Sequence, residues 1–184
     1  MSDPVIVEVA IAAPIEATWR ALREPSEIRR WHGWDYDDLE AEITAIYIDE
    51  VTASDEDLSL DTGAGRFQLE PRDGATLVRV TRPTPSGEAD WNGIYDEINE
   101  GWLSFTQQLR YYLERHPGED RRTFLIDAEI QPPAGEPWFK SDHQIGVQPN
   151  EHSLVIVTPE RTIVSTYGLD EPAIAALKAN LSPA

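Results

Sequence analysis

The sequence predicts an α+β fold, in which an antiparallel sheet is covered by one long helix and a β-rich extension follows. Three observations predict this class. Hydrophobic residues alternate with period two over 5–11 and across 43–81, which is typical of strands. An apolar face then recurs at steps of three and four over 91–115, which is typical of a long amphipathic helix. Alternation returns between 124 and 165, after the helix has ended.

The N-terminal segment is predicted as a strand followed by two short helices. Residues 5–11 alternate in hydrophobicity, so they form the strand. Pro14 suits the first helical position, because the N–H that it lacks has no partner there anyway, and Glu16 favours a helix N-terminus. Pro25 ends this helix and starts a second short one, which carries Ile28 and Trp31.

Residues 42–81 are predicted as an antiparallel meander of about four strands. A long strand spans 43–51, with Tyr47 on one of its faces, and a short strand covers 58–60. Asp73 and Gly74 form a strong hairpin signal between a strand that carries Phe67 and a return strand over 77–80. The proline- and glycine-containing segment 82–90 is a loop.

The helix over 91–115 has one broad apolar face, ending at His116-Pro117-Gly118. The residues of this face are Trp91, Ile94, Ile98, Trp102, Phe105, Leu109 and Tyr112. A helix with so many aromatic side chains on one side must lie across an apolar surface. The meander is the only predicted element large enough to supply it.

The chain continues for 66 residues past this helix, so we expect a first domain over 1–118 and an extension over 119–184. The pattern of the extension predicts about three strands and a short terminal helix, with a flexible joint at 132–135. A unit of this size without cysteines or a metal is marginally stable alone. We therefore expect the extension to dock on the main domain, completing or flanking its sheet.

The composition is strongly acidic, with 34 Asp and Glu against 15 Lys and Arg and a net charge of −19. Such a field repels phosphate backbones and anionic membrane surfaces, which argues against nucleic-acid binding. No apolar run reaches the length of a membrane span, and no signal-peptide pattern is visible. We expect a cytoplasmic protein. With no cysteine and four scattered histidines, we expect no metal and no cofactor.

Two stretches resemble a known family: "VEVAIAAPIEATWRALREPSEIRRWHGWD" (7–35) and "GWLSFTQQLRYYLE" (101–114). They are similar to the START-like SRPBCC superfamily, in the branch of the heat-shock-protein-90 ATPase activator homologues. The resemblance covers roughly the first two-thirds of the chain. It implies a helix-grip fold, with a curved sheet wrapped around the long helix, over 1–118. The extension departs from that pattern, as does a meander of four strands where the family usually has five or six.

The aromatic face of the long helix has two interpretations. Periodicity alone favours ordinary core packing. The resemblance instead implies a cavity between sheet and helix that would hold a small apolar molecule, such as a lipid-like, aromatic or polyketide-like ligand. The residues that would line this cavity are Trp34, Tyr47, Phe67, Trp102, Phe105 and Leu109.

The loop "WHGWDYDD" holds the densest polar group, with His32, Asp35, Asp37 and Asp38 within seven residues. A histidine beside carboxylates can serve as an acid or base near neutral pH. The spacing matches no metal-ligand motif, and a solvated loop explains it equally well. We assign no catalytic residue here.

Three functions stay open on the sequence. The leading one is a non-enzymatic module that binds a small hydrophobic ligand. A second is an enzyme of the cyclase or hydrolase type that uses the same cavity, with His32 or Tyr47 as the acid–base group. A third is a protein-binding role of the co-chaperone kind, which the sequence supports little. Ionisable side chains inside the cavity would favour the enzyme over the binding module.

Overall fold

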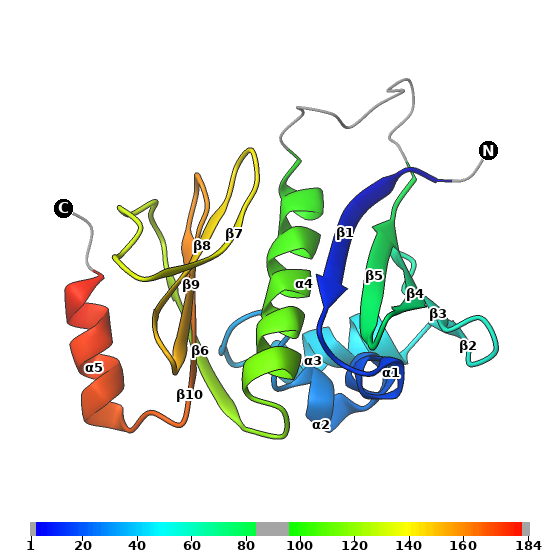
Figure 1. Ribbon diagram of the computed structural model, residues 1–184, viewed down its shortest axis with the longest axis horizontal. Coiled ribbons are helices and arrows are strands. Elements are labelled where there is room, and N and C mark those ends of the chain that lie inside the picture. Colours follow the sequence, from blue (N-terminus) through cyan, green and yellow to red (C-terminus); the bar gives the residue numbers. More distant parts are fainter. Residues whose placement is uncertain (1–2, 84–95, 182–184) are drawn as a thin grey trace. The chain divides into compact units, whose positions relative to one another are not determined.

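A computed structural model describes residues 3–83 and 96–181, and these form two compact units (Figure 1). The first unit comprises Met1–His32 and Asp37–Pro117, and the second comprises Gly33–Tyr36 and Gly118–Ala184. Each unit contains one five-stranded antiparallel sheet. The α+β class predicted from the sequence is confirmed.

The sheet of the first unit has the strand order β1-β5-β4-β3-β2. Its strands are β1 (Val5–Ile11), β2 (Thr52–Ser54), β3 (Ser59–Asp61), β4 (Arg66–Arg72) and β5 (Ala75–Thr81). The predicted hairpin joins β4 to β5, and both Asp73 and Gly74 have positive φ (45° and 82°). That backbone suits a two-residue turn between twisted strands. Four strands, β2 to β5, lie between Ala41 and Pro83. Strands β3, β4 and β5 correspond to predicted strands, whereas β2 was not predicted.

Two short helices follow β1, as the sequence predicts: α1 (Ile15–Arg23) and α2 (Pro25–Ile28). Pro14 is the N-cap of α1, one residue earlier than expected, and Pro25 is the first residue of α2. The indole of Trp31 donates a hydrogen bond to the Ala21 carbonyl over 2.9 Å. This bond fixes the chain after α2, where His32 follows.

The strand predicted over 43–51 is wrong. Residues Leu39–Ile43 form helix α3, and Thr44–Ile48 continue it as a π-helical turn, η1. Leu39, Ile43 and Tyr47 are four residues apart and all buried, which is helical spacing. Glu40 and Glu42 in the first turn of α3 are also favourable at a helix N-terminus. These signals outweigh the β-branched residues whose alternation resembles a strand.

Helix α4 (Glu97–Arg115) is the long helix, and it packs along β1 (Figure 1). The Asp96 carboxylate caps it by accepting from the Ile98 and Asn99 N–H groups, both over 3.0 Å. Its end at Arg115 agrees with the sequence, whereas its predicted start at Trp91 and Ile94 lies outside the described residues. Ile98 is 52% exposed, so it does not join the buried face.

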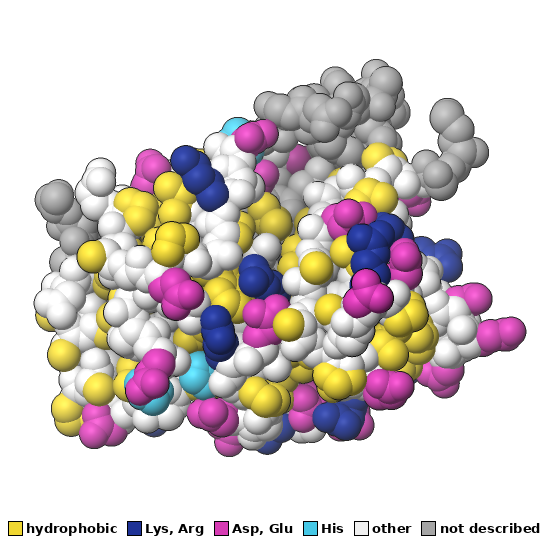
Figure 2. Space-filling model, in the orientation of Figure 1, with side chains coloured by type: hydrophobic (Ala, Val, Ile, Leu, Met, Phe, Trp, Pro, Cys, Tyr) yellow, Lys and Arg dark blue, Asp and Glu magenta, His cyan; other side chains and the backbone are white. Residues whose placement is uncertain are grey.

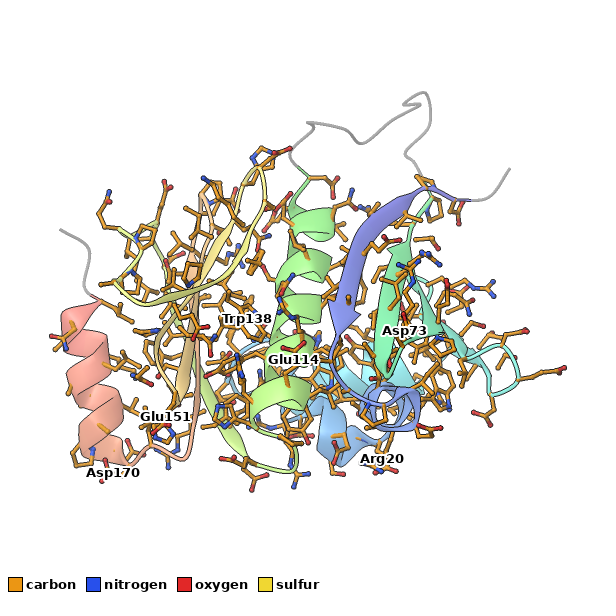
Figure 3. All side chains as sticks on the ribbon, in the orientation of Figure 1. Arg20, Asp73, Glu114, Trp138, Glu151 and Asp170 are labelled. Carbon is orange, nitrogen blue, oxygen red and sulfur yellow. The ribbon has the colours of Figure 1, made fainter. Side chains whose placement is uncertain are left out.

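Side-chain bonds tie α4 to the elements that surround it in the first unit. The Glu114 carboxylate, labelled in Figure 3, accepts from the Ala12 N–H at the end of β1 over 2.9 Å. The Tyr112 hydroxyl donates to Glu27 of α2 over 2.7 Å. A sheet with a long helix against it, preceded by one strand and two short helices, is consistent with the helix-grip arrangement.

The sheet of the second unit has the order β6-β10-β9-β8-β7. Its strands are β6 (Arg121–Ile126), β7 (Glu136–Lys140), β8 (Ile145–Asn150), β9 (Ser153–Val157) and β10 (Thr162–Tyr167), and helix α5 (Glu171–Asn180) follows. The sequence predicts about three of these five strands. Pro137 in β7 and Gly146 and Pro149 in β8 obscure the other two, because both residue types are depleted in strands. Segment 132–135, the predicted joint, connects β6 to β7.

An aliphatic cluster forms the core on one side of this second sheet. It contains Ile130, Val155, Val157, Val164 and Leu181, with Phe124, Ile126 and Leu177 packed against them. None of the helices that the structure describes is long and apolar enough to cross a membrane.

Candidate ligand site

Five aromatic side chains of the first unit form a closed ring of contacts, which we call the aromatic cluster: His32, Tyr47, Phe67, Trp102 and Phe105. Their ring centroids are separated by 5.1 Å (His32–Tyr47), 6.4 Å (Tyr47–Phe67), 5.3 Å (Phe67–Trp102), 6.4 Å (Trp102–Phe105) and 4.6 Å (Phe105–His32). Most of these pairs meet edge to face, the geometry that aromatic quadrupoles favour. The cluster therefore draws its members from four parts of the chain.

The local structure explains why each member faces the others. Trp102 and Phe105 are three residues apart on α4 and so share a helical face. Phe67 of β4 pairs with Val80 of β5, and both are buried on the inner face of the sheet. Tyr47 lies on the buried side of η1. His32 follows α2, where its N–H donates to the Ile28 carbonyl over 2.9 Å.

A hydrogen-bonded chain of three polar side chains runs into the aromatic cluster. His32 Nε2 lies 2.7 Å from Glu42 Oε1, and His32 Nδ1 lies 3.0 Å from the Tyr47 hydroxyl. A neutral imidazole satisfies both neighbours when Nε2–H donates to the carboxylate and Nδ1 accepts from the phenol. In that tautomer the Tyr47 hydroxyl donates to His32 and the His32 Nε2–H donates to Glu42, so both hydrogen bonds point toward the carboxylate.

The chain connects the interior to solvent. His32 and Tyr47 are fully buried, whereas the Glu42 side chain is 32% exposed. Burial raises the pKa of Tyr47 well above its ordinary value of 10.0, and the nearby charge of Glu42 raises this pKa further. The phenol therefore stays protonated at neutral pH. It can accept a proton only if it passes its own to His32.

The indole N–H of Trp102 is a second polar atom in the cluster. Trp102 is 5% exposed, and its Nε1 finds no hydrogen-bond acceptor among residues 3–83 and 96–181. A Cβ atom at position 65 would lie 3.3 Å from this nitrogen and 3.3 Å from Val80 Cγ1. Gly65 thus allows the turn before β4 to approach the indole closely. A buried donor without an acceptor is destabilising, and a ligand oxygen would relieve that cost.

The structure brings together four of the six residues that the sequence nominates as ligand-binding: Tyr47, Phe67, Trp102 and Phe105. Leu109, the fifth, lies one turn further along α4 and is fully buried. Trp34 belongs to the second unit, where the Arg161 guanidinium lies 5.6 Å from its ring centroid. The ligand-binding role of all six residues stays a prediction.

Sequence reasoning missed Glu42 as a partner of His32. The signal was present, because helical spacing of Leu39, Ile43 and Tyr47 places residue 42 near the buried side of the same turns. The acidic loop instead has a structural use: the Asp35 carboxylate accepts from the Thr123 N–H over 2.9 Å. Within the described ranges, no group of three His, Asp or Glu side chains could hold a metal ion.

Comparison with known proteins adds one structural neighbour. No family model matches the chain, and no curated protein matches it. The crystal structure of DynU16, a protein of the dynemicin biosynthetic locus, aligns over 94% of this chain and 91% of its own, with 13% identity and a TM-score of 0.36. That score is too low to support a functional conclusion, so function has to be inferred from the chain's own residues.

Proposed function

We propose that this chain is a helix-grip protein of the SRPBCC kind that binds a small hydrophobic molecule at the aromatic cluster, between the first sheet and α4. The observation that carries the proposal is the closed aromatic ring with a buried indole N–H that has no acceptor among the described residues. Ligand sites are mostly apolar and contain a few polar groups that orient the ligand. The aromatic cluster has this composition.

The polar atoms of the cluster define the ligand class. In the aromatic cluster, Tyr47 and Trp102 each contact Phe67. A ligand oxygen could therefore contact the Tyr47 hydroxyl or the Trp102 N–H while the rest of the ligand lies against the Phe67 ring. The indole N–H requires an acceptor such as a carbonyl oxygen. The phenol oxygen, whose proton is directed at His32, can accept from a ligand hydroxyl. A flat aromatic or polyketide-like molecule with carbonyl and hydroxyl groups fits both.

A neutral aromatic ketone, 2-acetylnaphthalene, tests the proposal. We expect saturable binding in a calorimetric titration and a shift of the Trp102 indole proton in nitrogen-15 NMR spectra. Trp102→Phe should weaken binding about five- to tenfold, the value of one hydrogen bond. Trp138→Phe, in the second unit, is the matched control and should leave the affinity unchanged. Binding that survives both Trp102→Phe and Phe105→Ala undiminished would contradict the proposal.

The chain Glu42–His32–Tyr47 favours a second candidate, an acid–base enzyme that uses the same site. A substrate proton would move to the Tyr47 oxygen while the phenol proton moves to His32 Nδ1 and the Nε2 proton moves to Glu42. Such concerted transfer makes the buried phenol a general base without leaving a charge on it. The partly exposed carboxylate could then release the proton to solvent.

Proton exchange at the methyl group of 2-acetylnaphthalene in D2O, followed by NMR, separates the two candidates. An enzyme should accelerate this exchange, and Tyr47→Phe and Glu42→Gln should each abolish the acceleration while changing the ketone affinity less than about threefold. If the wild-type protein binds the ketone but does not accelerate the exchange, the binding function is supported and the enzymatic function is excluded.

A further inference from the structure

A second hollow, of about 460 Å³, opens on the surface of the first unit, between α1 and the turn that joins β2 to β3. We call it the α1 groove. It is lined by Ile15, Glu16, Trp19, Arg20, Arg23, Glu24, Asp55 and Leu58. None of these residues belongs to the aromatic cluster. The volume lies within the range of about 300–1,000 Å³ that is usual for small-molecule sites.

The floor of the α1 groove is apolar and held in place. Its apolar residues are Ile15, Trp19 and Leu58. The Trp19 indole donates to Asp55 Oδ1 over 2.9 Å, which orients the ring and engages that carboxylate. Leu58 has a φ of 50°, a left-handed conformation that is unusual for a residue other than glycine. Strained backbone of this kind persists where the surrounding structure holds it, often at binding sites.

The rim of the α1 groove carries two arginines, Arg20 (labelled in Figure 3) and Arg23, which are three residues apart on α1. Within the described part of the chain, neither forms an ion pair with a carboxylate. Most other arginines of the first unit do: Arg29, Arg30, Arg72, Arg79, Arg82 and Arg110. The protein has 34 acidic residues, and acidic side chains are scattered over the face shown in Figure 2. Two neighbouring arginines without a carboxylate partner among the described residues are therefore notable beside an apolar floor.

Helix-dipole stabilisation explains why basic residues stand in the last turn of α1. It does not explain the hollow, the apolar floor or the lack of carboxylate partners. The Arg23 guanidinium lies 5.8 Å from the centroid of the Trp19 ring, so a cationic group already covers one side of the aromatic floor. Glu16, Glu24 and Asp55 also line the groove, so its ionisable side chains carry a net formal charge of −1. This balance disfavours polyanions, and an anion can bind only by direct contact with the two arginines.

We propose that the α1 groove binds a small amphipathic monoanion, whose flat apolar body lies against Trp19 and whose carboxylate contacts Arg20 and Arg23. Guanidinium groups bind carboxylates through paired, charge-assisted hydrogen bonds. The apolar floor supplies the remaining affinity through burial. This site is independent of the aromatic cluster, and its ligand differs from the neutral molecule proposed there by its charge.

Titration of the full chain with 2-naphthoate tests this site. We expect saturable binding that shifts the Trp19 indole proton in NMR spectra and weakens as salt rises from 50 to 300 mM. The reason is that Arg20 is exposed and Arg23 is partly exposed, so dissolved ions can screen their charges. Arg20→Gln with Arg23→Gln should lower the affinity at least tenfold. The matched control is Arg66→Gln with Arg72→Gln on β4, which removes the same charge from the same unit and should have little effect.

Three results would overturn the assignment. The first is equal affinity for the neutral analogue 2-naphthalenemethanol, because recognition would then not depend on charge. The second is naphthoate binding that is lost in Phe105→Ala and kept in the Arg20 and Arg23 double variant, because the anion would then occupy the aromatic cluster. The third is sedimentation with vesicles containing phosphatidylserine that the double variant abolishes, because the arginines would then bind a lipid surface. Unchanged 2-acetylnaphthalene binding in the double variant shows that the fold is intact.

Discussion

The two units build the same kind of sheet and fill its interior differently. Both have five antiparallel strands. Against the first sheet lie aromatic rings, with an imidazole, a phenol and an indole N–H among them. Against one side of the second lies the aliphatic cluster, made mainly of valine, isoleucine and leucine. Phe124 is its one aromatic member.

This difference indicates where a ligand would bind. Aliphatic side chains without polar atoms fill an interior at no electrostatic cost, so the aliphatic cluster has the composition of a plain core. Elsewhere in the second unit, Gln148 Nε2 and Ser153 Oγ are buried without a hydrogen-bond partner among the described residues, so the contrast concerns the two clusters and not the whole units. A buried polar atom stabilises the fold only when it has a partner. The aromatic cluster of the first unit contains three polar groups, and one of them, the Trp102 N–H, has no acceptor in the described ranges. Buried polar groups of this kind are more typical of binding sites than of packed cores. Four substitutions test whether the aromatic cluster is a binding site and the aliphatic cluster a packed core.

The largest stability loss is expected at Val164, in the aliphatic cluster. Val164 is fully buried and pairs across the sheet with Phe124 and Val155. Val164→Ala should lower the free energy of unfolding by about 2–3 kcal/mol, because two methyl groups are lost and a cavity remains. Urea unfolding measures the change. The affinity for 2-acetylnaphthalene at 25 °C should be unaltered. A parallel loss of affinity would contradict the view that the aliphatic cluster takes no part in ligand binding.

Compared with Val164→Ala, Phe105→Ala should lower the free energy of unfolding less and lower the ligand affinity more. Phe105 is only partly buried, so its removal is expected to lower the free energy of unfolding by about 1–2 kcal/mol instead of the 3–5 kcal/mol typical of a packed phenylalanine. The affinity for 2-acetylnaphthalene should fall about tenfold or more. Denaturant melts with and without the ketone measure both quantities. A loss above 4 kcal/mol with unchanged affinity would make the aromatic cluster ordinary core.

Tyr47→Phe should lower the free energy of unfolding by about 1 kcal/mol at pH 7, the value of one hydrogen bond. Its larger signature is at alkaline pH. The pKa of Tyr47 is higher in the folded than in the unfolded protein, so the unfolded chain releases this proton first. The stability that depends on the neutral phenol is therefore complete below pH 10 and is lost as the pH rises toward the folded-state pKa.

The variant should consequently lose less stability than wild type between pH 10 and 11.5. Urea unfolding at pH 7, 9, 10 and 11 measures this difference. Tyr36→Phe, at an exposed tyrosine, is the matched control and should follow the wild-type curve. Identical alkaline losses in wild type and Tyr47→Phe would indicate that Tyr47 titrates as an exposed phenol does.

The smallest stability effect is expected for Trp102→Phe. The smaller ring loses packing contacts, but the substitution also removes a buried N–H that has no acceptor within residues 3–83 and 96–181. The two contributions oppose each other. We expect a net change within about 0.5 kcal/mol in urea unfolding, far below the usual cost of truncating a buried tryptophan. A loss of 2 kcal/mol or more would mean that the indole N–H has a partner in solution.

Much of the fold could be predicted from the sequence because its signals are local. The Asp73-Gly74 turn, the proline at the start of α2 and the end of α4 at Arg115 depend on backbone conformations that a few residues set by themselves. Strands β7 and β8 were missed because their glycine and prolines are tolerated only in the finished sheet. The prediction that residues 119–184 dock on the first domain stays a prediction.

The sequence by itself determined the α+β class and most of the elements. It also named all five members of the aromatic cluster as candidates for one cavity, four as ligand-binding residues and His32 as an alternative acid–base group. Only the tertiary structure decided that residues 39–48 are helical, which places Glu42 beside His32 and Tyr47 in one hydrogen-bonded chain. The reason is that the apolar residues of this segment fit two patterns. Ile43, Ala45 and Tyr47 alternate as in a strand, whereas Leu39, Ile43 and Tyr47 are four residues apart as in a helix. Burial of Leu39, Ile43 and Tyr47 against the rest of the unit selects the helix, and no local pattern contains that contact.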